Sequence, residues 1–219
     1  MYSLSEENYL KAIYHLSNQG EDSVNTNAIA EEMKTAPASV SDMIRKLSKK
    51  KLVEYQKYRG VRISKKGKEI ALKVIRKHRL WEVFLVEKLN FKWDEVHDVA
   101  EQLEHIQSGQ LIERLDEHLG FPKFDPHGDP IPNANGELAP IPTTTLSMLK
   151  PGDKCRVVCA KDSSSDLLLY LDKINISLGA KLEVTDFHDF DASFSIQIDG
   201  ANPITLSSKV TEHIIVEEL

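Results

Sequence analysis

The sequence of 219 residues contains two cysteines, no long apolar run and no overall excess of positive charge. Cys155 and Cys159 cannot form a disulfide framework and fit a reducing compartment. No window approaches the roughly 18 consecutive apolar residues of a membrane span, and the N-terminus lacks the basic and apolar regions of a signal peptide. The sequence therefore predicts a cytoplasmic protein that does not contact a membrane.

The net charge of −6 argues at first against a nucleic-acid partner. However, residues 45–77 contain 14 Lys and Arg and only two acidic residues, Glu54 and Glu69, which gives this segment a charge of +12. Positive charge concentrated in one segment of an acidic protein favours contact with a polyanion. The alternative is a solvated helix face followed by a basic loop.

The spacing of apolar residues predicts three helices near the N-terminus. The first runs from Ser3 to about Ser17, with Ser3 or Ser5 as N-cap, and the second from Asn27 to Lys34, capped by Thr26. The third begins near Pro37. Its apolar positions follow the pattern i, i+3, i+4, i+7, at Val40, Met43, Ile44 and Leu47.

Two predicted strands, 52–55 and 61–63, follow with a basic hairpin at 56–60. Three helices and then a basic hairpin are the order of a winged helix-turn-helix, whose last helix enters the DNA major groove. A plain three-helix bundle is the alternative, but the basic hairpin favours DNA. The candidate DNA-binding residues are Thr26, Pro37, Ala38, Ser39, Ser41, Arg45, Lys46, Lys57 and Arg59.

The rest of the chain changes character twice. Two long amphipathic helices, Gly67 to about Leu89 and Asp94 to Leu119, suit a dimerisation module. Residues 121–145 contain six of the nine prolines, which predicts a connector. Short strands follow, at Lys154–Val158, Ala180–Asp186, Phe194–Ile198 and His213–Val216.

The predicted architecture is mainly α with a small β part: a winged helix-turn-helix, a helical dimerisation domain and a C-terminal SH3-like β-barrel. We place the domains at 1–73, 74–121 and 146–219, with the Pro-rich connector at 122–145.

Two of the predicted helices each present histidine and carboxylate side chains on one face. His97, Glu101, Glu104 and His105 share one face of the later helix, and His78 and Glu82 lie one turn apart on the earlier one. Imidazole together with carboxylate is a ligand set for Mn, Fe or Zn. The pattern favours a metal site over solvated faces with intrahelical pairing.

Several segments resemble the diphtheria-toxin-repressor family, which includes the manganese-transport regulators. The segments Ile75–Glu82 and Val96–His105 look like the two helices that carry its metal ligands. Further similar segments are Asn8–Tyr14 (first helix), Val40–Leu47 (recognition helix), Tyr55–Gly60 (wing) and Pro126–Pro132 (connector).

This resemblance implies a repressor of metal-uptake genes, not an enzyme, that a divalent metal activates and that binds a double-stranded DNA operator as a homodimer. It also implies two metal sites. Asn8, Glu101, Glu104 and His105 would form the first, and His78, Glu82 and His97 the second, to which the connector and C-terminal domain would add Asp125, His127 and Asp166 as candidate ligands.

Two positions bear on the metal. Glu101 stands where iron-type members have Cys, which favours Mn²⁺ with Fe²⁺ as the alternative. Lys11 stands where manganese-type members have a further Glu, which argues against a two-metal cluster of their type.

Without metal, we expect Glu82, Glu101 and Glu104 to repel one another and the first helix to be loosely attached. One alternative is a winged-helix regulator that responds to an organic ligand, in which the His and Glu faces are only structural. A metal-dependent hydrolase ranks lower, because no nucleophile or catalytic-base motif accompanies the ligands.

Overall fold

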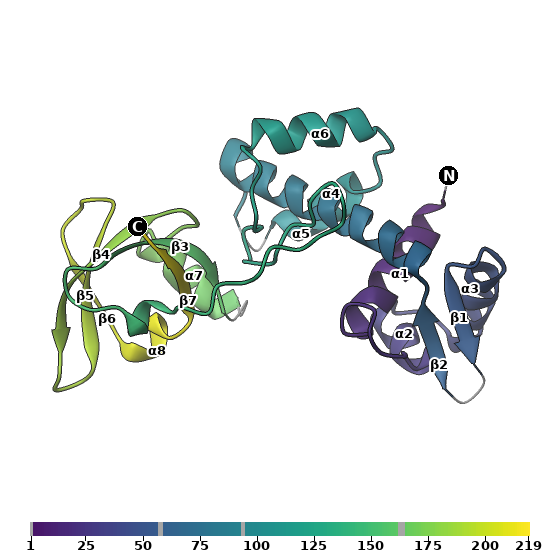
Figure 1. The fold of residues 1–219 in the computed structure, drawn as a ribbon, viewed down its shortest axis with the longest axis horizontal. Coiled ribbons are helices and arrows are strands. Elements are labelled where there is room, and N and C mark those ends of the chain that lie inside the picture. Colours follow the sequence, from purple (N-terminus) through teal and green to yellow (C-terminus); the bar gives the residue numbers. More distant parts are fainter. Residues whose placement is uncertain (1, 57–58, 93–94, 162–164) are drawn as a thin grey trace. The chain divides into compact units, whose positions relative to one another are not determined.

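The computed structural model describes residues 2–56, 59–92, 95–161 and 165–219 (Figure 1). The predicted DNA contact Lys57 therefore lies outside the described residues. The chain forms two compact units. The first comprises Met1–His78, Glu101–Gly109 and Pro132–Glu137, and the second comprises Arg79–Ala100, Gln110–Ile131 and Leu138–Leu219.

The first unit begins with helices α1 (Leu4–Leu16), α2 (Thr26–Glu32) and α3 (Pro37–Lys49). Ser3 caps α1 as predicted: its side chain accepts a hydrogen bond from the Glu6 backbone N–H, and the Glu6 carboxylate accepts one from the Ser3 N–H. The prediction that Thr26 caps α2 is wrong. Asn25 is the N-cap, and its side-chain oxygen accepts from the Asn27 N–H at 2.9 Å.

Strands β1 (Val53–Gln56) and β2 (Gly60–Ile63) form the predicted antiparallel hairpin after α3. Gly60 has a φ of +91°, and a Cβ there would lie 2.5 Å from the Val24 carbonyl oxygen, so the close approach of these chains requires glycine. The core of this unit joins the apolar faces of the helices and the hairpin. It includes Leu10, Ile13, Ile29, Val40, Ile44, Leu47, Leu52 and Val61.

Helix α4 runs from Lys65 to Leu89. The single helix expected from Asp94 to Leu119 is wrong: the structure has α5 (Val96–Leu103) and α6 (Gly109–His118) instead. Glu104 and His105 follow the end of α5, and Glu104 is wholly buried there. The apolar spacing of three and four residues ends at Ile106 and resumes only at Leu111, with Gly109 between them, so the sequence did contain a sign of the break.

The C-terminal sheet has five antiparallel strands in the order β6-β5-β4-β3-β7. They are β3 (Lys154–Ala160), β4 (Lys181–His188), β5 (Ser193–Ile198), β6 (Ile204–Leu206) and β7 (Ile214–Glu218). Four elements of this part of the chain were not predicted: η1 (Leu146–Met148), α7 (Ser165–Lys173), β6 and α8 (Ser208–Thr211).

The Pro-rich segment holds an ordered turn within the second unit. One Asp125 carboxylate oxygen accepts hydrogen bonds from the backbone N–H groups of His127 and Asp129, both at 2.9 Å. Gly128 has a φ of +89°, and a Cβ there would lie 2.1 Å from the Cys159 Cβ on β3, so the turn packs directly on the sheet domain. Among the described residues, no helix is both long and apolar enough to cross a membrane.

Candidate metal centre

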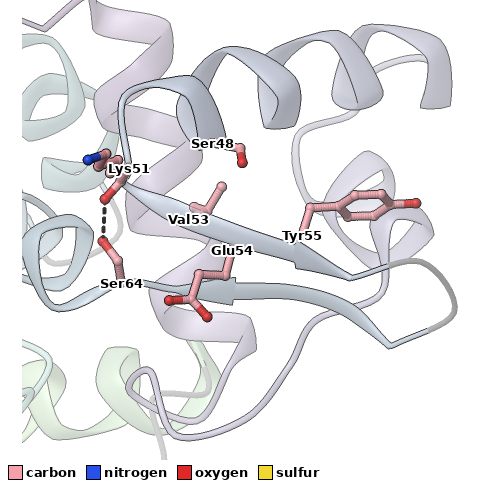
Figure 2. A pocket seen from close by; sticks show the side chains of 6 residues that line it. All are labelled: Ser48, Lys51, Val53, Glu54, Tyr55 and Ser64. Carbon is pink, nitrogen blue, oxygen red and sulfur yellow. Dashed lines mark hydrogen bonds between the residues drawn. The ribbon is translucent and has the colours of Figure 1, made fainter.

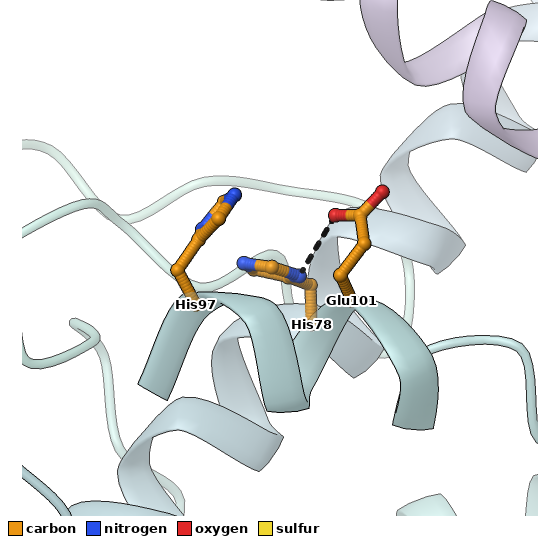
Figure 3. Close-up of side chains that lie close together, drawn as sticks. All are labelled: His78, His97 and Glu101. Atoms are coloured by element: carbon orange, nitrogen blue, oxygen red, sulfur yellow. Dashed lines mark ion pairs between the residues drawn. The ribbon is translucent and has the colours of Figure 1, made fainter. Parts of the chain in front are cut away.

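Within the first unit, acidic and imidazole side chains from α1, α4 and the end of α5 converge around Glu104. We call Glu7, Asn8, Lys11, His78, Glu101, Glu104 and His105 the α1 cluster. The Glu104 carboxylate is completely buried and accepts a hydrogen bond from His78 Nδ1 at 2.7 Å. Glu101, two residues before the end of α5, is partly exposed and lies 3.8 Å from the same His78 nitrogen (Figure 3).

Lys11 supplies a cation to this cluster. Its Nζ lies 2.6 Å from a Glu101 oxygen and 2.8 Å from each Glu104 oxygen. The Lys11 ammonium joins α1 to two of the carboxylates, a contact that the expectation of a loosely attached first helix did not include. Burial raises the pKa of Glu104, but the hydrogen bond from His78 and the charge of Lys11 outweigh it and hold this pKa below its ordinary value.

His105 is held between two carboxylates. Its Nδ1 donates to Glu7 at 2.7 Å, while its Nε2 lies 3.6 Å from a Glu104 oxygen. A carboxylate that holds one ring nitrogen leaves the other oriented toward a ligand position, as is common for metal-binding histidines. Glu7 was not among the predicted site residues. Its position one helical turn before Lys11 was the available signal.

Asn8, the predicted first-helix ligand, carries an unsatisfied atom. Its side-chain oxygen is buried and has no hydrogen-bond partner among the described residues. A buried oxygen acceptor is costly to leave unpaired, and an amide oxygen can coordinate a divalent cation.

Within the second unit, Glu82, His97, Asp125 and His127 form what we call the connector cluster. Glu82, Asp125 and His127 each offer a ligand atom, and these atoms lie within 4.8 Å of one another. Glu82 also lies 3.6 Å from His97 Nδ1 and 3.7 Å from His127 Nδ1.

Asp125 is almost entirely buried and resists ionisation. Burial and the negative charge of Glu82 raise its pKa to about 7, although the nearby Arg79 guanidinium acts in the opposite direction. Arg79 Nε lies 3.3 Å from Asp125, but Arg79 also contacts Asp129 at 3.2 Å and donates to the Pro130 carbonyl at 2.6 Å.

The residues predicted for the second site have different ion-pair partners. His78 donates to Glu104 of the α1 cluster, whereas Glu82 and His97 pair within the connector cluster. Figure 3 shows His97 one turn before Glu101 on α5. Asp166 lies exposed in the first turn of α7. It belongs to no group of potential metal ligands found among the described residues.

The candidate DNA-binding residues of α3 lie on its solvent face. Pro37, Ala38, Ser39, Ser41, Arg45 and Lys46 are all exposed, as is Arg59 beside β2, and Thr26 is half-buried. The Ser41 hydroxyl donates to the Pro37 carbonyl at 3.0 Å, and Arg45 pairs with Asp42 at 3.1 Å on the surface.

A pocket near the hairpin was not predicted. It is lined by Ser48, Lys51, Val53, Glu54, Tyr55 and Ser64, and the Ser64 hydroxyl donates a hydrogen bond to the Lys51 carbonyl (Figure 2). No histidine lines it, and we assign it no function.

Glu6 connects the first turn of α1 to α3. Its buried carboxylate lies 2.6 Å from Lys50 Nζ and 3.2 Å from Lys46 Nζ. Although burial raises its pKa, hydrogen bonds from Lys50, Ser3 and Lys46 prevail and lower it to about 2. Adjacent residues of α1 thus contact the candidate recognition helix (Glu6) and the α1 cluster (Glu7).

Three family descriptions match successive parts of the chain. Residues 1–61 match "Iron dependent repressor, N-terminal DNA binding domain", residues 64–133 match "Iron dependent repressor, metal binding and dimerisation domain", and residues 144–218 match "FeoA domain". Together they confirm the expected sequence of domain types along the chain.

Individual relatives agree. The diphtheria toxin repressor of Corynebacterium jeikeium is 30% identical over 72% of this chain and 66% of its own length. The regulator MntR of Oceanobacillus iheyensis is 34% identical over 55% of this chain and 81% of its own. The solved structure of a manganese-dependent transcriptional repressor in complex with manganese is 38% identical, covers 98% of this chain and 100% of its own, and has a TM-score of 0.65. The chain spans less than two thirds of the diphtheria toxin repressor (66%) and of the iron-dependent repressor IdeR of Mycobacterium bovis (54%).

Proposed function

The chain belongs to the iron-dependent repressor family, whose members are transcriptional repressors, and on this premise we propose that it is a cytoplasmic repressor that a divalent metal activates. It binds an operator in double-stranded DNA as a homodimer and controls genes of metal uptake. Mn²⁺ is the proposed activating ion, with Fe²⁺ as the alternative. The observation that carries this proposal is the convergence of carboxylates and imidazoles around Glu104, together with the buried, unsatisfied oxygen of Asn8, the residue next to Glu7 on α1.

The donor set fits a divalent metal of the Mn or Fe type. Glu101, Glu104, His105 and Asn8 would hold the ion of the first site with oxygen and imidazole nitrogen and no thiolate, and oxygen ligands suit Mn²⁺. Glu82, His97, Asp125 and His127 would hold a second ion, and we keep His78 and Asp166 as candidate ligands there. The ion supplies positive charge that joins side chains of separate helices.

Residues of α1 would transmit metal binding to the proposed recognition helix α3. Asn8 and Glu7 lie in the same turn of α1 as Glu6, whose carboxylate contacts Lys46 of α3 and Lys50, the C-cap of that helix. A fixed position of α1 therefore constrains α3, the proposed recognition helix. The metal can favour DNA only through a difference in its affinity for the DNA-competent arrangement, typically about 5–150-fold.

The test is DNA binding with and without metal. Duplexes selected from a random-sequence library in the presence of Mn²⁺ are titrated by fluorescence anisotropy, with chelator, Mn²⁺ or anaerobic Fe²⁺. We expect metal to tighten binding by about 5–150-fold. Glu104→Ala and His105→Ala should lose this gain, while Asp172→Ala, which changes an exposed acid of α7, should keep it. Metal dependence like that of the wild type in both cluster variants would contradict the proposal.

One observation favours the alternative of an organic-ligand regulator. Lys11 already pairs with Glu101 and Glu104 and compensates one of their two negative charges, as a side chain in a purely structural network would. Under that alternative, DNA binding would be equally strong in chelator and in Mn²⁺.

A further inference from the structure

The Lys11 ammonium occupies the space between the carboxylates that would hold the metal. Its Nζ lies within 2.8 Å of three oxygens, one from Glu101 and two from Glu104. The Lys11 side chain is 16% exposed and that of Glu104 is 0% exposed, so the contact with Glu104 is largely shielded from water. Lys11 is one helical turn from Glu7 and Asn8 on α1, which brings the cation and the candidate ligands to the same face of that helix.

These oxygens cannot serve an ammonium and a divalent cation at once. Hydrogen bonds of 2.6 and 2.8 Å between the Lys11 ammonium and these oxygens leave no room for a metal ion bound to the same atoms. An ammonium and a metal ion that shared these oxygens would also repel each other strongly, because water is largely excluded there. A lysine ammonium is attached through a flexible chain of four carbons and can move to solvent.

We propose that Lys11 is a tethered cation that occupies the first metal site in the metal-free protein and is displaced by the incoming divalent ion. This inference rests on the proposed function. Under it, Lys11 sets the metal concentration at which the protein responds. No bond is made or broken: one cation replaces another on the Glu101 and Glu104 oxygens. Lys11 also stabilises the metal-free protein, because it compensates the buried charge of Glu104.

Lys77 provides a matched control on the same cluster. It is half-buried on α4 and interacts with Glu7 and Glu104 through its charge. Removal of its charge changes the local potential without emptying the position between Glu101 and Glu104. A displacement mechanism therefore predicts a larger effect for Lys11 than for Lys77.

The experiment measures Mn²⁺ affinity by isothermal titration calorimetry without DNA, in a His127→Ala background that weakens the connector cluster. We expect Lys11→Met and Lys11→Gln to bind Mn²⁺ about tenfold or more tightly than the background protein, because a competing like charge is gone. Lys11→Arg should not bind more tightly, and Lys77→Gln should gain less. The melting temperature in chelator should fall in Lys11→Met and rise further on addition of Mn²⁺ than it does in the background protein.

The possible results distinguish the displacement role of Lys11 from the proposed function. If the background protein binds Mn²⁺ and the Met and Gln variants bind it equally or more weakly, the displacement role of Lys11 is wrong while the metal site stands. An equal gain for Lys77→Gln also overturns displacement. If no folded variant binds Mn²⁺, the proposed function fails and this inference fails with it. As a second measurement, a Mn²⁺-loaded crystal in which Lys11 Nζ still contacts both Glu101 and Glu104 would overturn the inference.

Discussion

The α1 cluster and the connector cluster contain similar side chains, but their buried carboxyl groups are stabilised in different ways. In the α1 cluster, Lys11 lies between Glu101 and Glu104, and the pKa of Glu104 is lowered. In the connector cluster, Arg79 divides its contacts among Asp125, Asp129 and a carbonyl, and the pKa of Asp125 rises to about 7. A metal ion would therefore compete with a lysine at the first cluster and with a proton at the second.

The largest expected effect separates the buried and exposed partners of Lys11. In the metal-free protein, Glu104→Ala should cost about 3–5 kcal/mol of unfolding free energy, because it leaves Lys11 and His78 without their buried acceptor. Glu101→Ala should cost about 1 kcal/mol or less, since that carboxylate is partly exposed. Urea denaturation in chelator, followed by circular dichroism, measures both. Equal losses would show that Lys11 does not compensate a buried charge.

The next effect tests the proton at the connector cluster. The pKa of Asp125 is raised from 3.8 to about 7, so between these values the folded protein holds a proton that the unfolded chain releases. Asp125 therefore lowers stability as pH rises through this window, and its contribution levels off above about 7. We expect Asp125→Asn, which retains an oxygen acceptor for the turn, to flatten this decline in thermal melts of the metal-free protein between pH 5 and 8. An unchanged slope would mean that Asp125 ionises normally.

A third effect concerns communication with the DNA face. Glu6→Gln removes the charge that contacts Lys46 and Lys50 and leaves Glu7 and Asn8 in place. We expect the Mn²⁺ affinity to persist and the metal-dependent gain in DNA affinity to shrink to a few-fold from the typical range of about 5–150-fold. Calorimetry and anisotropy measure the two quantities separately. Asp42→Asn, which breaks only the exposed pair with Arg45, is the control and should keep the full gain. If Glu6→Gln also keeps it, the connection through Glu6 is not used.

The sequence predicted much of the helical architecture, because the first, third and fourth helices have strong apolar periodicity and clear starts such as Ser3 and Pro37. The break after Leu103, where the chain turns to bury Glu104, was missed although the apolar spacing is interrupted between Ile106 and Leu111, because apolar residues on both sides of the gap suggested one continuous helix. Helix α7 was missed because its short leucine run lies among strands.

Several contacts at the candidate site were also not predicted, because they join residues that are far apart in the sequence. The resemblance drew attention to Asn8 and to the unusual Lys11, but it could not reveal that Lys11 reaches Glu101 and Glu104 across some 90 residues of sequence. Glu6 and Glu7 likewise point to different partners although they are adjacent, because neighbours on a helix project about 100° apart. The ligand roles themselves stay predictions, and only the experiments above test them.

The smallest expected effect distinguishes DNA contact from metal response. Arg59 is exposed beside the hairpin and belongs to neither cluster, so Arg59→Ala should weaken binding to all DNA sequences and lower the slope of log affinity against log salt by about 1. Lys57→Ala carries the same prediction. The loss should be equal in chelator and in Mn²⁺, in contrast to Glu6→Gln, whose loss should appear only with metal. Ser39→Ala and Ser41→Ala should instead change sequence preference, because their side chains lie on the α3 face proposed to meet base edges. Anisotropy titrations at several salt concentrations decide the matter: a loss confined to one operator base would contradict a phosphate role for Arg59, and a loss confined to the metal-loaded protein would place Arg59 in the metal response.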